Sequence, residues 1–164
     1  MASWVHSFNP AIIAIDSPCQ FAALGKSRKP ERDLMQAGIH SFFTPTEELA
    51  RNSRFYDWVF NGMALYQSLS YPVFSGKFES TGLCIETFPN AIEKIMLPQS
   101  SIRVGESKNA VRRLVLDRLG YAAEELPSMD FVDAALCSIA AERFHYGKYR
   151  LFGNSIDGFI VTPI

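Results

Sequence analysis

Acidic side chains beside apolar runs are the groups of this 164-residue sequence best suited to chemistry. Asp16 ends the apolar run 11–15, and Glu86 lies inside the apolar segment 82–88. A carboxylate is costly to bury unless a cation or hydrogen-bond donors accompany it. Asp16 is followed by Ser17 and Pro18, which commonly end a strand in a turn. Asp16 is therefore either a strand cap or a ligand of a cation.

Two further acids, Asp130 and Asp133, are three residues apart in the segment 128–147, so on a helix they share one face. Acids in a first turn favour the helix dipole, which explains Asp130 without any site. Asp133 is less well explained, because Ala134 beside it is small enough to let the helix approach a sheet closely. Carboxylates that converge at strand ends suit Mg²⁺ or Mn²⁺. A pair of such ions can position water and stabilise the leaving oxygen in phosphodiester cleavage.

The hydrophobic pattern predicts the elements that must position these acids. Apolar, β-branched runs predict strands at 11–15 and 82–88, and a final strand follows the turn at Asp157. Caps and helical spacing predict helices at 31–37, 54–69, 89–96, 107–120 and 128–147. Alternation of strands with helices indicates an α/β fold, and the length suits a single domain over 1–164. The aromatic stripe of 54–69 is expected to be core packing rather than a cofactor site.

Composition excludes several classes of protein. With 48% hydrophobic and 20% charged residues, the chain is typical of soluble globular proteins. The net charge of −1 does not favour tight binding to a long nucleic acid. Cys19, Cys84 and Cys137 form no CxxC pair, so neither a zinc site nor a disulfide framework is indicated. No run approaches the roughly 18 apolar residues of a membrane span, and we expect a cytoplasmic protein without membrane contact.

Several motifs occur in the same order as in one prokaryotic family. From about residue 11 to residue 164 the chain resembles domain-of-unknown-function family 429, whose members are identified as predicted nucleases of the RNase H-like fold. The motifs that carry the resemblance are IAIDSP, ERDLMQAGI, FFTPT, IETFP, SKNAVRRLVLDRLG, MDFVDAALCSIAA and DGFIVTPI. The Asp130-x-x-Asp133-Ala134 motif also resembles the carboxylate helix of Holliday-junction resolvases.

The resemblance implies an RNase H-like mixed sheet with flanking helices and a metal site at its strand ends. It implies that Asp16 and Asp133 hold the metal, with Asp130 close by. Residues it implies as further neighbours of the site are Glu86, Asn90 and Asp157.

The start of the chain departs from that fold. Proteins of this fold begin with a β-meander whose first strand carries a metal-ligating aspartate, whereas no acid precedes Asp16 here. We therefore expect an N-terminally short domain, with a metal centre that is weak or absent. Strand 11–15 would expose an apolar edge, which proteins seldom leave open. We expect a homo-oligomer, a dimer, to cover this edge through Trp4, Val5 and Phe8.

Basic residues could contact a phosphate-rich ligand. Arg28, Lys29 and Arg32 lie in the loop after Asp16, where ligands contact α/β proteins. Lys108 lies on the predicted helix 107–120, where a solvated helix face explains it equally well. The segment 26–32 has no aromatic residue, so it offers no stacking platform for bases.

These observations give one expected function and two alternatives. The first is a Mg²⁺- or Mn²⁺-dependent nuclease, a hydrolase in which Asp16 and Asp133 hold metal and Glu86 or Asp130 assists. Its substrate, a nucleic acid or nucleotide, would be bound by Arg28, Lys29, Arg32 and Lys108. The second is a catalytically incompetent oligomeric scaffold or binding relative. The third is a small-molecule phosphohydrolase or nucleotide-binding protein on the same fold, which the near-neutral charge suits.

Overall fold

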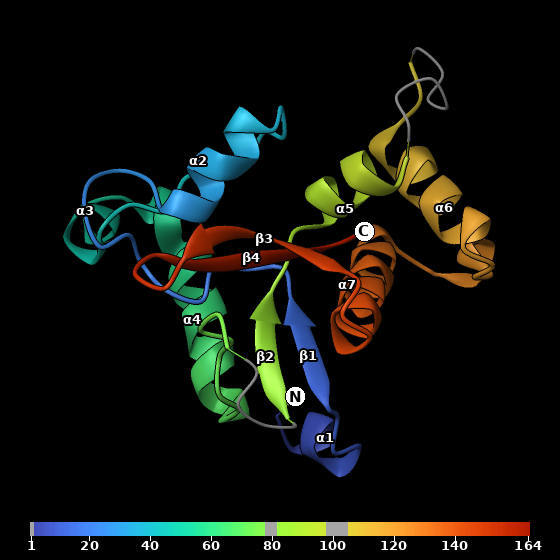
Figure 1. The fold of residues 1–164 in the computed structure, drawn as a ribbon, viewed down its shortest axis with the longest axis horizontal. Coiled ribbons are helices and arrows are strands. Elements are labelled where there is room, and N and C mark those ends of the chain that lie inside the picture. Colours follow the sequence, from blue (N-terminus) through green and yellow to red (C-terminus); the bar gives the residue numbers. More distant parts are fainter. Residues whose placement is uncertain (1, 78–81, 98–104) are drawn as a thin grey trace.

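A mixed sheet forms the centre of the molecule (Figure 1). The computed structural model describes residues 2–77, 82–97 and 105–164. Within them the strand order is β1 (Ile12–Ile15), β2 (Leu83–Glu86), β4 (Gly158–Pro163), β3 (Tyr149–Asn154). The first three are parallel, and β3 is antiparallel to β4. The predicted α/β class is confirmed; β3 was not predicted, because its sequence Tyr-Arg-Leu-Phe-Gly-Asn has no sustained apolar run.

The register brings the carboxyl ends of β1 and β2 together. Ile15 is opposite Glu86, so Asp16 directly after β1 lies at the same edge as the last residue of β2. Between β2 and β4 the only register pair in the described part of the chain is Glu86 with Ile160. The β3–β4 hairpin accordingly crosses the direction of β1 and β2 in Figure 1. This divergence leaves room for a hollow beyond the ends of β1 and β2.

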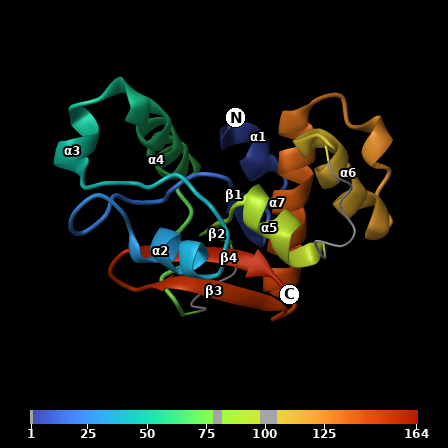
Figure 2. The same cartoon turned by 90° about the horizontal axis from the view of Figure 1, so that it is seen from above.

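Helices cover both faces of the sheet. On one face Ile12, Leu83 and Val161 belong to a cluster that includes Phe144 of α7 (Met129–His145). The opposite face packs against α4 (Asp57–Leu69), α2 (Lys29–Gln36) and α5 (Pro89–Met96). In Figure 2, α3 (Glu47–Arg51) and α4 lie at one end of the molecule and α6 (Lys108–Arg118) at the other. The other elements of the described ranges are the helix α1 (Ala2–Ser7) and the 3₁₀ turns Arg54–Tyr56 and Ala123–Glu125.

Local sequence signals explain most helix boundaries. The Ser107 hydroxyl accepts a hydrogen bond from the Ala110 N–H (3.2 Å) at the start of α6. Pro89 occupies the first helical position of α5, which runs over the predicted range 89–96. Ser128 precedes α7 as its N-cap residue, as predicted. The helix α1 was not predicted from sequence.

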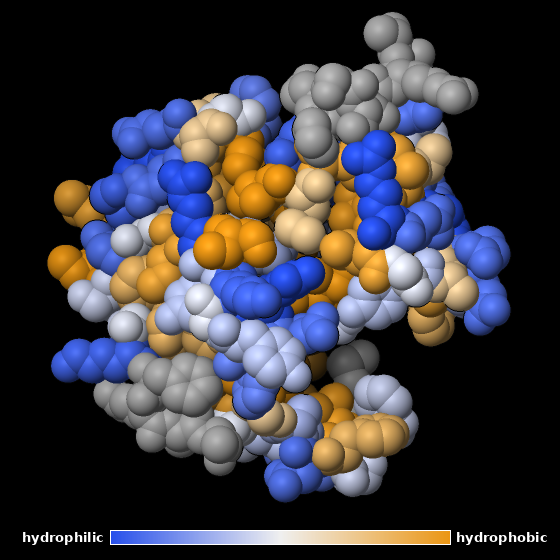
Figure 3. Space-filling view, turned by 45° about the vertical axis from the view of Figure 1, so that its right-hand side comes forward, coloured by the Kyte–Doolittle hydropathy of each residue, from blue (hydrophilic) through white to orange (hydrophobic). Residues whose placement is uncertain are grey.

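The edge of the sheet at β1 remains open in the described structure. β1 pairs with β2 on one side, and a hollow of about 300 Å³ on its other side lies between α1 and α7. Trp4 and Phe8 of α1 line it and are 66% and 65% exposed. On the side of the molecule that Figure 3 shows, apolar and hydrophilic side chains are interspersed. The dimer expected to cover the β1 edge stays a prediction.

The three cysteines are free thiols, and Cys84 and Cys137 are buried. Loss of hydration raises the pKa of Cys84 to about 11, so its thiol is un-ionised at neutral pH. Among the helices of the described ranges, none has both the length and the apolar character needed to cross a bilayer.

Candidate functional site

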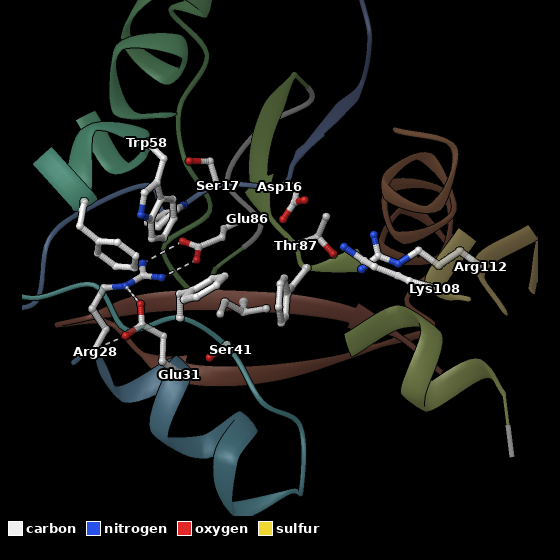
Figure 4. Close-up of a pocket in the computed structure, with 15 residues that line it drawn as sticks. Asp16, Ser17, Arg28, Glu31, Ser41, Trp58, Glu86, Thr87, Lys108 and Arg112 are labelled. Atoms are coloured by element: carbon white, nitrogen blue, oxygen red, sulfur yellow. Dashed lines mark hydrogen bonds and ion pairs between the residues drawn. The ribbon is translucent and has the colours of Figure 1, made fainter. Parts of the chain in front are cut away.

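A hollow of about 410 Å³ opens at the carboxyl ends of β1 and β2 (Figure 4). We call it the strand-end pocket; the residues that line it include Asp16, Arg28, Trp58, Glu86, Lys108 and Arg112. They come from the loop after β1, from the ends of β2 and α2, and from α4 and α6. Ligands commonly bind at this edge of parallel sheets.

A closed network of ion pairs forms one end of the strand-end pocket. Arg28 and Glu86 are 1% and 4% exposed, and they meet side by side. Arg28 Nη1 donates to Glu86 Oε2 (2.8 Å) and Nη2 donates to Oε1 (2.5 Å). Arg28 Nε donates to Glu31 Oε1 (2.9 Å), and Glu86 also accepts the Cys19 N–H (3.0 Å). Every guanidinium nitrogen of Arg28 is therefore engaged, as Figure 4 shows.

This network holds the loops around the pocket in place. Glu31 Oε2 accepts the backbone N–H groups of Arg28 (3.0 Å) and Thr44 (2.8 Å), which join two separate loops. Burial alone would lower the pKa of Arg28, but Glu86 and Glu31 outweigh it and raise that pKa. Arg28 stays charged, and its role in this structure is to bind the two acids.

Asp157 performs a similar anchoring role at the β3–β4 turn. It is buried and accepts the N–H groups of Ala23 (3.0 Å) and Lys29 (2.8 Å). Burial would raise the pKa of Asp157, but these hydrogen bonds outweigh it and lower that pKa. Asp157 therefore fixes the loop after β1 to the hairpin, outside the lining of the strand-end pocket.

Two of the predicted substrate-binding residues lie away from the pocket. Lys29 Nζ pairs with Asp33, and Arg32 Nη2 lies 3.5 Å from Asp157 Oδ2. Neither side chain lines the strand-end pocket, whereas Arg28 and Lys108 do. Of the four, Lys108 forms no ion pair within the described residues, so its charge is the one available to a ligand.

Among the acids that line the pocket, Asp16 is the one whose carboxyl oxygens have no hydrogen-bond donor among the described residues. It is solvent-accessible and forms no hydrogen bond or ion pair with any described residue. Its pKa is raised to about 6, first because the surrounding protein displaces water and second because the Asp133 carboxylate lies close by. Arg112 and Lys108 oppose this rise. Both protonation states of Asp16 are therefore populated near neutral pH.

A second arginine, Arg112, lies at the other end of the pocket and is 2% exposed. Its Nη1 donates to Asp133 Oδ1, and its Nε lies 3.4 Å from Glu93 Oε2. These contacts connect α6 to α7 and to α5. Lys108 lies one helical turn before Arg112, and the two form a cationic wall beside Asp16 in Figure 4.

Aromatic rings also line the strand-end pocket. The Phe42 ring centroid lies 6.1 Å from that of Phe55 and 6.3 Å from that of Trp58. Phe42 and Phe55 are 68% and 58% exposed. The expectation that the stripe 54–69 is core holds for Val59, but it was wrong for the two rings at the start of that stripe.

The physical reason for that error is the position of the helix start. The later turns of α4 pack against β1 and β2, whereas Phe55 and Trp58 come before or at its first turn and line the pocket. Periodicity assigns one face to a whole segment and cannot detect where the underlying sheet ends. The consecutive Phe42 and Phe43, in a loop bounded by Pro45, were a signal of exposed rings that the sequence reasoning missed.

The Asp133 carboxylate lies close to Asp16, but the predicted acids form no metal-binding group of three within the described residues. Glu86 is bound by Arg28, and Asp133 is bound by Arg112. Asp130 is exposed and does not line the strand-end pocket. Across residues 2–77, 82–97 and 105–164, no three metal-binding side chains are grouped as a cation site would require. Because a guanidinium already neutralises Asp133, these residues do not fit a two-metal centre.

Comparison with known proteins identifies the family. Residues 1–157 match the family described as protein of unknown function, DUF429. Comparisons with curated proteins and with solved structures gave no match. The match covers Asp16, Glu86 and Asp133 and every motif that carried the resemblance except DGFIVTPI, of which it includes only Asp157. This chain therefore belongs to the DUF429 family.

Proposed function

We propose that the strand-end pocket binds a ligand in which an aromatic ring is joined to a phosphate group, that is, a nucleotide or a nucleotide unit of a nucleic acid. One observation carries this proposal: aromatic rings, among them Phe42, Phe55 and Trp58, and two cations, Lys108 and Arg112, line the same hollow. Its volume of about 410 Å³ lies within the usual range for small-ligand sites.

The rings supply an apolar, planar surface. Phe42 and Phe55 are largely exposed, and Trp58 lies beside them. Stacking of a base on an aromatic side chain contributes about 1–3 kcal/mol and tolerates every base, because each has a π-face. These rings therefore favour a nucleobase without selecting one.

The cations supply the phosphate contact. Glu93 and Asp133 hold the Arg112 guanidinium through Nε and Nη1, so its orientation is set before a ligand arrives. A guanidinium fixed in this way suits the paired oxygens of a phosphate. Lys108 adds a charge that forms no ion pair with any described carboxylate. Arg28 is not assigned to the ligand, because Glu31 and Glu86 already engage its three nitrogens.

Calorimetric titration with three probes tests the proposal. AMP carries both ring and phosphate, adenosine carries only the ring, and ribose 5-phosphate carries only the phosphate. We expect AMP to bind at least about tenfold more tightly than either fragment, a difference of roughly 1.4 kcal/mol. Absence of AMP binding by the folded protein, or equal binding of AMP and ribose 5-phosphate, would refute it.

Matched variants assign each contact. Lys108→Ala should reduce AMP affinity toward that of adenosine, whereas Lys148→Ala, which removes an exposed charge outside the pocket, should not. Phe55→Ala should reduce AMP affinity toward that of ribose 5-phosphate. Its control is Phe131→Ala, which removes a ring that is 56% exposed on α7. If a variant and its control lose the same AMP affinity, AMP does not bind through the tested side chain of the pocket.

A second candidate function is hydrolysis of a phosphate ester in the same pocket. The observation that favours it is Asp16, whose raised pKa of about 6 suits a general base beside two cations. Asp16 would accept a proton from water as the water oxygen bonds to phosphorus. The ester P–O bond would break, its oxygen taking a proton from solvent, while Lys108 and Arg112 stabilise the added negative charge.

Cleavage of a short single-stranded oligonucleotide tests this candidate. We expect a rate that rises with pH through about 6 and is lost in Asp16→Asn, since the ionised carboxylate is the base. The metal-dependent nuclease expected from sequence is tested by Mn²⁺ titration of the same protein and of Asp133→Asn. Saturable Mn²⁺ binding that Asp133→Asn abolishes would favour the metal mechanism. Folded protein without ligand binding or cleavage would favour the scaffold alternative.

A further inference from the structure

A second hollow adjoins the strand-end pocket. It has a volume of about 300 Å³, and we call it the adjoining hollow; it is lined by His40, Ser41, Phe42, Phe88, Asn90, Lys108 and Arg112. Five of these, Ser41, Phe42, Phe88, Lys108 and Arg112, also line the strand-end pocket. The two hollows are therefore parts of one groove, and the cationic wall lies along their junction.

Each hollow has a ring of its own, and the lining that the two hollows share holds both cations together with the rings of Phe42 and Phe88. Phe55 and Trp58 line only the strand-end pocket, and His40 lines only the adjoining hollow. Phe88 provides an aromatic surface common to both. Two nucleosides joined by a phosphodiester offer matching groups, two planar bases and a phosphate that links them.

Charge distinguishes the two hollows. Asp16, Glu31 and Glu86 line the strand-end pocket. Arg28 pairs with Glu31 and Glu86, and its single charge neutralises them only in part. Among the described residues no acid lines the adjoining hollow, and its two charged lining residues, Lys108 and Arg112, are cations. An anionic backbone that leaves the strand-end pocket is therefore favoured to continue into the adjoining hollow.

Polar groups at the junction also have unused hydrogen-bonding capacity. The Ser41 Oγ atom is buried and has no hydrogen-bond partner among the described residues, and Ser41 lines both hollows. Buried polar atoms without partners are rare in folded proteins. The Asn90 side-chain amide donates to the His40 carbonyl oxygen (3.0 Å), which orients its own oxygen as an acceptor. A phosphate oxygen could accept from Ser41, and a base edge could donate to Asn90.

We infer that the ligand of this groove is a single-stranded oligonucleotide of at least two nucleotides. Its bridging phosphate lies against Lys108 and Arg112, one base stacks on the rings of the strand-end pocket, and the next nucleoside occupies the adjoining hollow. This inference rests on the proposed function, because it requires that the strand-end pocket binds one nucleotide unit. The volumes agree, since each hollow is near the lower limit of a small-ligand site.

Affinities of AMP and of the dinucleotide ApA, measured by calorimetry at one salt concentration, test the inference. AMP has the larger phosphate charge, so electrostatics alone favours AMP. We expect ApA to bind at least about tenfold more tightly, which only a contact to the second nucleoside explains.

A charge-insertion variant locates the second nucleoside. His40 is exposed and lines only the adjoining hollow, so His40→Glu should remove the advantage of ApA and leave AMP affinity within about twofold. Gln67→Glu places the same charge on α4 outside both hollows and should change neither affinity. Equal affinities for AMP and ApA would overturn the inference and leave the proposed function intact. Failure of both ligands to bind would overturn both.

Discussion

Two buried arginines lie at opposite ends of the strand-end pocket. The same types of residue surround them, but they differ in how many guanidinium nitrogens are left to bind a ligand. Arg28 and Arg112 are 1% and 2% exposed, and each lies between two carboxylates. All three guanidinium nitrogens of Arg28 donate to Glu31 or Glu86. Arg112 uses Nε and Nη1 in this way, and its Nη2 forms no bond to a described residue.

The difference separates structure from ligand binding. At the Arg28 end the acids also accept backbone N–H groups from Cys19, Arg28 and Thr44, so the network closes on itself. At the Arg112 end Lys108 forms no ion pair with a described residue, and the Asp16 oxygens accept no hydrogen bond from one. A charged residue that lines a pocket is therefore a ligand contact only where donors or acceptors are left over.

The largest expected effect is on stability at the Arg28 end. Arg28→Met would leave Glu31 and Glu86 buried without their cation, so we expect a loss of about 3–5 kcal/mol in the free energy of unfolding. Urea denaturation measures it. Arg112→Met should cost less, because Asp133 is 21% exposed and can be hydrated. Equal losses in the two variants would contradict the distinction between the two ends.

Close packing at Gly62 gives the next prediction. A Cβ added to Gly62 of α4 would come 1.6 Å from Ser17 Oγ, and the Ser17 carbonyl is held by the Tyr66 hydroxyl (3.0 Å). Although alanine favours a helix over glycine, we expect Gly62→Ala to destabilise the fold by about 1–3 kcal/mol through this overlap.

The double variant Ser17→Gly/Gly62→Ala is the control for this contact. It removes the side chain that the new methyl group meets, so thermal denaturation should show most of the lost stability restored. A single Gly62→Ala variant as stable as the natural chain would mean that the turn after β1 moves without cost.

A smaller effect is expected on affinity at the Arg112 end. Arg112→Lys keeps the charge but loses the fixed, planar pair of donors, so we expect AMP affinity to fall about tenfold, or roughly 1.4 kcal/mol. Calorimetry measures this change. Arg113→Lys on the same helix is the control, because Arg113 bonds to the carbonyls of Ala123 and Leu126 and does not line the pocket. An equal fall in both variants would indicate a general effect on α6.

Local signals in the sequence predicted the elements but not the ion pairs. Apolar runs identified β1 and β2, and Pro89 and Ser128 marked the starts of α5 and α7. The pairing of Arg28 with Glu86 joins residues 58 positions apart, so it depends on how the loop after β1 folds over β2. From its residue type alone Arg28 was predicted to contact a phosphate. In the structure its guanidinium group binds Glu31 and Glu86 instead.

Exposure of single residues was equally hard to predict. Asp16 and Lys108 were identified as site residues because of their types and positions, and both line the strand-end pocket. Phe55 and Val59 belong to one periodic stripe, yet Phe55 is 58% exposed and Val59 is fully buried. Hydrophobic periodicity reports which side chains share a face, and only the tertiary fold decides how far along the helix that face is covered.

The smallest expected effect concerns the pH dependence that Asp16 gives to stability. Its pKa rises from 3.8 to about 6 on folding, so between these values the folded chain binds more protons than the unfolded chain. Stability attributable to Asp16 should therefore fall as pH rises from 4 through 6. Asp16→Asn removes this loss. The variant should therefore be more stable than the natural chain above pH 6 and equally stable below pH 4. Urea denaturation across that pH range measures the difference. Solvent access to Asp16 keeps the gain modest. A gain independent of pH would mean that Asp16 is not the titrating group. A loss at pH 7 would mean that the cationic wall of Lys108 and Arg112 outweighs desolvation, so that Asp16 stabilises the fold as the acids around Arg28 do and is not an open carboxyl group.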